Sequence, residues 1–315
     1  MRSLLPSFLF LLSIPSPVIS ETWIPLAKIP LAPRQEHATV FLPPDNIIIV
    51  GGITNGTQST TNIIQSYSTR KNKWTSLPPL PIALNHPNAA VVNEELYVLG
   101  GLAQTTDAWV AIADSWVYNP RKQSWTPIAP VPEARGSAAI QFTSPYAQDT
   151  VSTVSIYSPK TNTWLSVPDA ASHLPDTRDH ACSAVVNQKF YVLGGREKGQ
   201  INGKGSVLVL DLENLENGWV VSSAVMPTPR AGLACGTVSG KVYTFGGEGN
   251  LNVENGVFNV TEVYDTKTNS WLKLGQMKLP RHGGGAVAVN GRVYVPGGGD
   301  VIGMAPVTYF DVLLP

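Results

Sequence analysis

Short apolar segments that end in two adjacent glycines recur along the chain. Four of them read LYVLGG, FYVLGG, VYTFGG and VYVPGG. The doublets lie at intervals of 49, 94, 52 and 51 residues, beginning at Gly51, Gly100, Gly194, Gly246 and Gly297. Each segment has the length of a β-strand, and glycine commonly marks the turn that follows a strand. Because no segment has the spacing of an amphipathic helix, the pattern predicts short strands joined by turns.

Aromatic residues repeat with the same period. Tryptophans stand at intervals of 51, 51, 39, 55 and 52 residues, at Trp23, Trp74, Trp125, Trp164, Trp219 and Trp271. Four tyrosines each precede the next tryptophan by seven residues, namely Tyr67, Tyr118, Tyr157 and Tyr264. A period of about 50 residues is typical of four-stranded propeller blades, in which glycines permit close backbone approach and aromatic rings fill the spaces between sheets.

A glycine doublet after an apolar strand, followed by tyrosine and then tryptophan, resembles the kelch motif. The resemblance covers residues 21–315 and implies one domain, an all-β, six-bladed kelch-type β-propeller, because six repeats of about 50 residues match this length. Trp23 begins this region with no strands before it, whereas the last repeat has Tyr309 and Phe310 but no tryptophan. We therefore expect the N-terminal strand to close the last blade, which removes free sheet edges.

The third repeat is shorter than the others. Only 22 residues separate Arg135 from Tyr157, where other repeats have 33 to 34, and the glycine doublet is absent. The missing length, about 12 residues, corresponds to one strand and its turn at roughly 3.3 Å per residue. We expect a truncated third blade, which reflects either a lost second strand or coding sequence lost from the gene model.

Residues 1–20 have the composition of a secretory signal peptide. Arg2 precedes an apolar run from Leu4 to Ile14, and residues 18–20 form a small-residue cleavage pattern. No later run approaches the roughly 18 apolar residues that a membrane-spanning helix needs. We expect a secreted, extracellular, monomeric protein with no membrane span.

Charge and sequons narrow the class of partner. The chain has 22 basic and 22 acidic residues, and only 14% of it is charged, which argues against a nucleic-acid or membrane-surface partner. Asn55-Gly56-Thr57 and Asn259-Val260-Thr261 match the acceptor sequence for N-glycosylation.

The antiparallel geometry of a blade places the residues before its first strand beside those after its glycine doublet. Arginine occupies nearly the same position before five of these strands, at Arg34, Arg135, Arg178, Arg230 and Arg281. Leu84 takes this place in the second repeat. The guanidiniums either bind a carboxylate or an anionic sugar at the channel mouth, or tie loops to neighbouring carbonyls, with nearby acidic residues such as Glu36, Asp179 and Glu248 neutralising them.

Three histidines also share one column. His37, His86 and His180 each stand 14 residues before their doublet. A metal site would bring their nitrogens within about 2.1 Å of one ion. The first and fourth repeats lie opposite one another in a six-bladed ring, so we expect packed or hydrogen-bonded histidines, no metal site and no cofactor.

The loops that follow the doublets supply further candidates. Trp109 lies in a polar loop and is either a platform for a sugar ring or a buried anchor of the loop. Glu197 and Glu248 are candidate ligand-binding or acid–base residues. Cys182 and Cys235 lie 12 and 11 residues before their doublets, so they have opposite parity in adjacent inner strands and form either a disulfide or two buried thiols.

No linear catalytic motif is present, which favours a non-catalytic role. Propeller enzymes assemble their sites from different blades, so enzyme activity stays open as an alternative. The resemblance to secreted fungal kelch-repeat proteins implies an extracellular binding module that contacts a glycan or a protein through its channel-mouth loops. Two more distant resemblances imply alternatives. One is a kelch-like mutarotase of an anionic sugar, and the other is galactose oxidase, whose copper site uses a cysteine crosslinked to tyrosine, a second tyrosine and two histidines.

Overall fold

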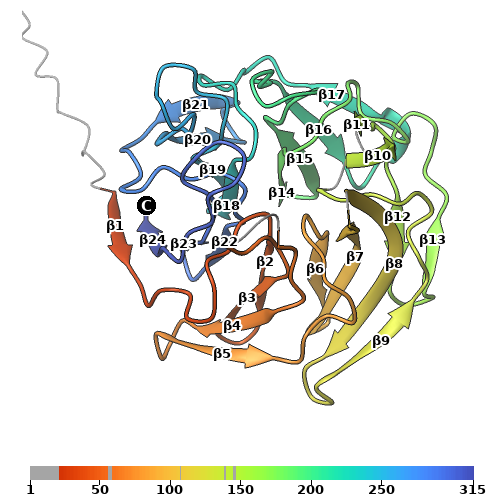
Figure 1. The fold of residues 1–315 in the computed structure, drawn as a ribbon. Helices are drawn as coiled ribbons and strands as arrows, with labels where there is room; N and C mark the ends of the chain where they lie inside the picture. The colour runs from red at the N-terminus through yellow and green to blue at the C-terminus, as the bar shows by residue number, and fades with distance from the viewer. Residues whose placement is uncertain (1–20, 56–58, 107, 138–139, 145–146) are drawn as a thin grey trace, which may run out of the picture.

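The computed structural model describes residues 21–315 except 56–58, 107, 138–139 and 145–146, and it shows antiparallel sheets arranged around a central channel (Figure 1). The one helix in the described part of the chain is a short 3-10 turn, η1 (Leu215–Asn217). No helix among these residues is long and apolar enough to cross a membrane. The all-β prediction is confirmed. The expected signal peptide, residues 1–20, lies outside the described residues.

In the part of the chain that the structure describes, five four-stranded sheets form the blades. Two of them come from the first half of the chain: β2 (Ala38–Leu42), β3 (Asn46–Val50), β4 (Ile64–Ser68) and β5 (Lys73–Leu77), then β6 (Ala89–Val92), β7 (Glu95–Gln104), β8 (Trp109–Asn119) and β9 (Ser124–Ile128). Two more follow: β14 (Cys182–Val186), β15 (Lys189–Leu193), β16 (Val207–Asp211) and β17 (Trp219–Val221), then β18 (Ala234–Val238), β19 (Lys241–Phe245), β20 (Thr261–Asp265) and β21 (Ser270–Lys273).

The fifth blade joins the two ends of the described chain. Its strands are β22 (Val287–Val289), β23 (Arg292–Pro296), β24 (Phe310–Leu314) and β1 (Thr22–Pro25), in that order. Trp23 of β1 is opposite Leu313 of β24 in antiparallel register, and Figure 1 shows β1 at the outer edge beside β24. The prediction that the N-terminal strand closes the last blade is confirmed.

The prediction of six blades is wrong, because the described residues form five four-stranded blades. The segment expected to form the third blade makes two separate two-stranded sheets. These are β10 (Ile140–Ser144) with β11 (Ala147–Thr150), and β12 (Ile156–Ser158) with β13 (Thr163–Leu165). The physical reason is chain length: the segment is about 12 residues shorter than the other repeats and has no glycine doublet, so its second strand, β11, has only four residues. Among the described residues the two hairpins are not hydrogen-bonded into one sheet.

The repeated tyrosines and tryptophans pair across the two outer strands. Tyr67 is opposite Trp74, and their ring centroids are 5.2 Å apart. Tyr157 and Trp164 keep this pairing in the β12–β13 hairpin, also at 5.2 Å. The aromatic motif therefore survives in the incomplete segment, and this made the count from sequence too high.

The glycine doublets link each blade to the next segment of the ring. Gly246 has a φ of +58°, and a Cβ at this position would collide with the carbonyl oxygen of Arg281. The adjacent Gly247 N–H donates to that same carbonyl at 2.8 Å. The equivalent hydrogen bond runs from the Gly298 N–H to the carbonyl of Arg34 at 2.8 Å. The last blade is therefore joined to the first by the same contact that joins other neighbouring blades.

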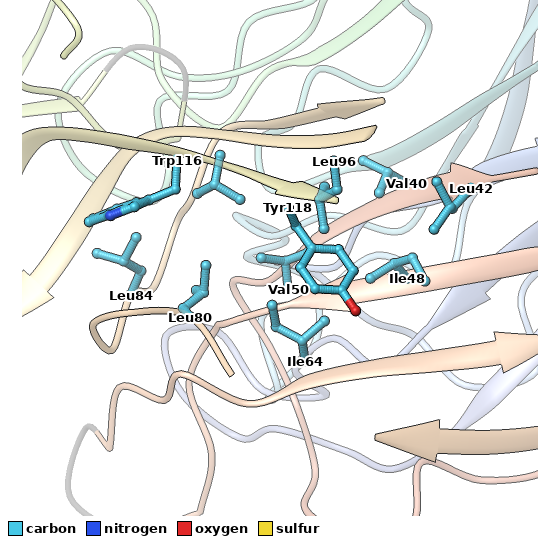
Figure 2. Close-up of a cluster of buried hydrophobic side chains, with 11 residues drawn as sticks. Val40, Leu42, Ile48, Val50, Ile64, Leu80, Leu84, Leu96, Trp116 and Tyr118 are labelled. Atoms are coloured by element: carbon cyan, nitrogen blue, oxygen red, sulfur yellow. The ribbon is translucent and has the colours of Figure 1, made fainter. Parts of the chain in front are cut away.

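Apolar side chains fill the spaces between adjacent blades. Figure 2 shows one cluster, in which Val40, Ile48 and Val50 from the β2–β5 sheet face Leu96 and Tyr118 from the β6–β9 sheet. Burial of such side chains contributes roughly 1.5–3 kcal/mol each. The clusters between blades hold the sheets at fixed positions and so fix the loops around the channel.

Cys182 of β14 and Cys235 of β18 form a disulfide, with their Cα atoms 6.0 Å apart. The bond joins the inner strands of two neighbouring blades, as the opposite parity of the two residues allows. It uses both cysteines, so neither sulfur remains for a cysteine–tyrosine crosslink of the galactose oxidase type.

Candidate functional site

Six residues in the left-handed backbone region surround the channel. Each stands two positions after an arginine or after Leu84, and each has a φ between 49° and 63°. They are Glu36, His86, Ser137, His180, Gly232 and Gly283. Backbone hydrogen bonds connect them: the N–H of His86 donates to Glu36 at 2.8 Å, and that of Gly283 donates to Gly232 at 2.9 Å. We call these six residues the channel ring. Its rigid backbone directs three side chains toward one point.

Those side chains belong to Glu36, His86 and His180. Nε2 of His86 lies 3.0 Å from Oε2 of Glu36 and 3.1 Å from Nε2 of His180. Nε2 of His180 is 3.9 Å from the same Glu36 oxygen. One ligand atom from each residue therefore lies within 4.8 Å of the other two. We call these three residues the channel cluster.

A second group of polar residues holds the channel cluster in place. Asp179 accepts from His180 Nδ1 at 2.5 Å and from Arg196 Nε at 2.9 Å. Arg196 also forms an ion pair with Glu248 and lies 3.4 Å from His180 Nε2. All of these groups are buried. The cluster is thus supported by a connected ionic network rather than by isolated contacts.

His282 completes this polar centre. Its Nε2 lies 2.9 Å from the carbonyl oxygen of Val301. Its Nδ1 faces the carboxylates of Glu36 and Glu248 at 3.8 and 3.5 Å. That nitrogen is buried and has no hydrogen-bond partner among the described residues.

The surroundings determine the charge of the central groups. Burial by itself raises the pKa of Glu36, but His86, His180 and His282 outweigh it and hold that pKa well below its usual range. Burial, and then the Arg196 guanidinium, lower the pKa of His180. At neutral pH these directions favour an ionised Glu36 next to a neutral His180.

Two cavities meet at the channel cluster. The larger, of about 490 Å³, is lined by the cluster together with Gln35, Trp109, Arg196 and other loop residues. The smaller, of about 250 Å³, is lined by the cluster and by residues of the inner strands, including Cys182 and Cys235. We call the larger cavity the mouth chamber. Its residues come from before the first strands and from after the doublets, and isolated bridges such as Asp179↔Arg196 confirm the predicted convergence.

The five predicted arginines are buried outside the cluster. Arg34 donates to the carbonyls of Gly51 and Ile63 at 2.9 and 3.2 Å. Equivalent contacts bring Arg178 to Gly194, Arg230 to Gly246 and Glu262, Arg281 to Val295 and Asp311, and Arg135 to Thr153 and Glu133. We call these residues the arginine layer. Its geometry is that of the loop-tying alternative, whereas binding of an anion by these residues stays a prediction.

The histidines of the column are packed or hydrogen-bonded, as expected, and the three do not all converge: His86 and His180 meet in the channel, whereas His37 does not. His37 is separate: it is buried beside Gly52 and Gly297, and burial lowers its pKa to about 3. The cause is the length of the first hairpin. Three residues separate Leu42 from Asn46, whereas two separate Val186 from Lys189, so alignment on the doublet places His37 where Glu36 belongs.

The remaining predicted residues lie at different depths. Trp109 lines the mouth chamber and contacts His86, with ring centroids 5.7 Å apart and ring planes tilted by 55°. Glu248 is buried against Arg196, whereas Glu197 is exposed and accepts from Lys204 at 3.1 Å.

Among the sequons, Asn55 is exposed and Asn259 is partly buried, while Gly56 and Thr57 lie outside the described residues. Arg196, Asp179 and His282 were not predicted to share a site. Asp179 and His282 each stand 15 residues before their doublet and directly after an arginine, and this shared position could have grouped them, whereas Arg196 follows its doublet.

Comparison with known proteins agrees with this architecture. Residues 141–313 match the model of the KLHDC2/KLHL20/DRC7 Kelch-repeats domain, and residues 37–81 and 83–132 match the Kelch motif. The chain belongs to the kelch-repeat family. This confirms the resemblance found in the repeats.

Relatives of this kelch-repeat chain include proteins of fungi and animals. Kelch-like protein terF of Aspergillus terreus is 38% identical over 292 residues, which cover 86% of this chain and 62% of that protein. Kelch-like protein 23 of Homo sapiens is 24% identical over 283 residues, covering 89% of this chain and 40% of that protein. The chain thus spans less than two thirds of either relative.

One solved structure shares the fold. A structure titled "Structure of YjhT" superimposes with a TM-score of 0.71 and 18% sequence identity. The superposition covers 90% of this chain and 95% of the other. At this level of identity the likeness establishes the kelch-type propeller fold alone.

Proposed function

We propose that this kelch-repeat propeller is an extracellular binding module that contacts a protein partner with its channel-mouth face. The observation that carries the proposal is a group of exposed apolar side chains on three neighbouring loops. Leu251, Ile201 and Met304 are 77%, 57% and 43% exposed. Val253 and Val301 are exposed on the same loops. Clustered apolar residues with a polar surround are typical of interaction surfaces.

Contacts between these loops support the proposal, because they hold the apolar residues in fixed positions. The N–H of Ile302 donates to the carbonyl of Asn255 at 2.8 Å, and the Asn255 side chain donates to Asp300 at 3.1 Å. The N–H of Gly303 donates to Glu248 at 3.3 Å. A surface that is ordered before binding loses less conformational entropy on association.

The extracellular location rests on the sequence of residues 1–20 and on the disulfide between Cys182 and Cys235. Disulfides persist in oxidising compartments. Expression of the full chain with a C-terminal tag, followed by N-terminal sequencing of protein from the medium, tests this point. A new N-terminus near Glu21 is expected, and protein retained in the cell with residues 1–20 intact contradicts it.

Affinity capture tests the interaction surface. The wild-type protein, a Leu251→Asp/Met304→Asp variant and a Leu272→Asp control are used as baits in culture medium of the source. Leu272 is 63% exposed on the outer strand β21, so the control adds the same charge away from the mouth. A specific partner is expected with wild type and control but not with the double variant. Equal capture by all three baits contradicts the assignment of the surface.

A second candidate function is binding of a glycan in the mouth chamber, with acid–base chemistry on that sugar as its enzymatic form. The observation that favours it is the lining: Trp109, Arg196 and Glu248 surround a cavity of about 490 Å³. Pockets for small ligands have volumes of roughly 300–1,000 Å³. An aromatic ring beside charged groups suits an amphipathic sugar.

Thermal unfolding with a panel of neutral and acidic sugars tests the glycan. A ligand at 100 times its dissociation constant stabilises the folded state by about 2.7 kcal/mol. The expected result is a rise in melting temperature with one class of sugar, which Trp109→Ala abolishes. A rise that Trp109→Ala leaves intact places the sugar elsewhere, and no rise with any sugar argues against this candidate.

A further inference from the structure

The partners of His86 and His180 determine which ring nitrogen of each carries the hydrogen. Asn85 Oδ1 lies 2.6 Å from His86 Nδ1, and an Asp179 carboxylate oxygen lies 2.5 Å from His180 Nδ1. Asn85 is oriented by its Nδ2, which donates to Thr60 at 2.6 Å. Both facing oxygens are acceptors, so each Nδ1 is a donor and each Nε2 of the neutral ring presents a lone pair.

The two Nε2 lone pairs and the Glu36 carboxylate therefore face one another. The contact between His86 Nε2 and His180 Nε2 is 3.1 Å, and the Glu36 oxygen is 3.0 Å from the first of them. Three electron-rich atoms at such distances repel one another unless a proton or a metal cation lies between them. Arg196 Nη2 donates to the His180 Nε2 lone pair at 3.4 Å, and beyond this long contact the site requires a positive group that the three side chains do not themselves provide when both rings are neutral.

The spacing of the three atoms suits a metal ion. A triangle with sides of 3.0, 3.1 and 3.9 Å has a circumscribed circle with a radius of about 2.0 Å, so one point lies at that distance from all three atoms. Bonds from zinc to histidine nitrogen and to carboxylate oxygen are about 2.0–2.2 Å long. The three atoms already allow this bond length, and rotation of the Glu36 side chain would bring the wide angle between Glu36 and His180 toward the tetrahedral value that zinc prefers.

The charge of the surrounding network also favours a divalent cation. The network contains three carboxylates, those of Glu36, Asp179 and Glu248, and one guanidinium, that of Arg196. With neutral imidazoles, two negative charges remain in a buried group, and uncompensated buried charge is costly. Although Arg196 lies near His180, its charge is paired with two of the carboxylates.

His282 gives an independent indication. Its Nε2 faces the carbonyl of Val301, so the Nδ1 of the neutral ring presents a lone pair toward Glu36 and Glu248. The side chain is only 1% exposed, and Nδ1 has no hydrogen-bond partner among the described residues. When this ring is neutral, a fourth buried acceptor points toward the same deficit of positive charge.

We propose that Glu36, His86 and His180 bind one divalent transition-metal ion at the centre of the channel. Two imidazoles and one carboxylate suit zinc or ferrous iron better than calcium or magnesium, which prefer oxygen ligands. Asp179 and Asn85 orient the two rings through Nδ1, the usual role of residues behind metal-bound histidines. The cluster lines both cavities, so water or a ligand in the mouth chamber can reach the ion.

Zinc titration of the chelator-treated full chain tests the site. Competition with a chromophoric chelator gives the affinity, and elemental analysis gives the stoichiometry. One Zn²⁺ per chain is expected for wild type, with no competition from Mg²⁺. His86→Gln and His180→Gln each lower the affinity by more than about 100-fold, and Asp179→Asn lowers it by about 10- to 100-fold.

His37→Gln is the matched control. His37 is a buried histidine next to Glu36 in sequence but outside the channel cluster, so this variant keeps wild-type affinity. A measurement on wild type alone covers the case in which variants fail to fold: bound Co²⁺ gives visible absorption bands characteristic of nitrogen and oxygen ligands. Two results overturn the proposal: failure of the wild type to bind Zn²⁺ or Co²⁺, and equal binding by a folded His86→Gln/His180→Gln variant. Either result means that protons, and not a metal ion, separate the three acceptor atoms.

Discussion

The arginine layer and the channel ring occupy neighbouring positions in the same loops, yet their polar groups have opposite environments. Arg230 is fully buried, pairs with Glu262 at 2.6 Å and donates to the carbonyl of Gly246 at 2.6 Å. Two residues further along the equivalent loops, Glu36, His86 and His180 bring three acceptor atoms together, and the Arg196 guanidinium reaches His180 Nε2 at 3.4 Å. The contrast indicates that the arginines stabilise the fold, because their charges and donors are paired within it. The acceptors of the channel ring, by comparison, are arranged to bind a cation from outside the protein.

The largest expected effect comes from breaking an ion pair of the arginine layer. Arg230→Met leaves the buried Glu262 without its guanidinium, and loss of one member of a buried pair costs about 3–5 kcal/mol of unfolding free energy. Urea denaturation measures this value. Arg230→Met combined with Glu262→Leu removes both charges and should recover most of the loss, and equal loss in both variants contradicts the pairing argument.

The disulfide comes next in expected size. Cys182 and Cys235 are 53 residues apart and join β14, which follows His180, to the inner strand of the next blade. The Cys182→Ser/Cys235→Ser variant should lose about 2–4 kcal/mol of unfolding free energy. Comparing urea midpoints of wild type with and without a reductant checks the value, and no change on reduction contradicts the bond.

Two glutamates, one buried beside the channel cluster and one exposed on a loop, should differ in their effect on stability. Glu248→Gln removes a buried partner of Arg196, and hydrogen bonds to charged groups contribute about 1.5–3 kcal/mol. Glu197→Gln changes an exposed residue beside Lys204, so no measurable change in the urea midpoint is expected. Equal effects of the two substitutions contradict the depths that the structure gives these residues.

The features predicted correctly from sequence are those in which one residue type has one structural task in every repeat. The doublet glycines and the paired Tyr67 and Trp74 are of this kind, and so is the closing strand at Trp23. The number of blades was wrong because Tyr157 and Trp164 keep their pairing in a hairpin that is not part of a four-stranded blade.

The channel cluster could not be predicted from the doublets because it depends on differences between repeats. One additional turn residue after Leu42 shifts the register of the first repeat, so Glu36 takes the position that His86 and His180 hold in theirs. Arg196 and Glu248 approach from loops that vary in length and sequence. Their contacts follow from the packing of loops around the channel rather than from any repeated spacing.

The most direct test of this account is X-ray diffraction from crystals soaked in Zn²⁺, recorded at wavelengths on both sides of the zinc absorption edge. The account predicts one anomalous peak in the channel, about 2.0–2.2 Å from Glu36, His86 and His180, with the arginine layer unchanged. A peak elsewhere, or no peak together with water molecules bonded to both Nε2 atoms, would contradict it.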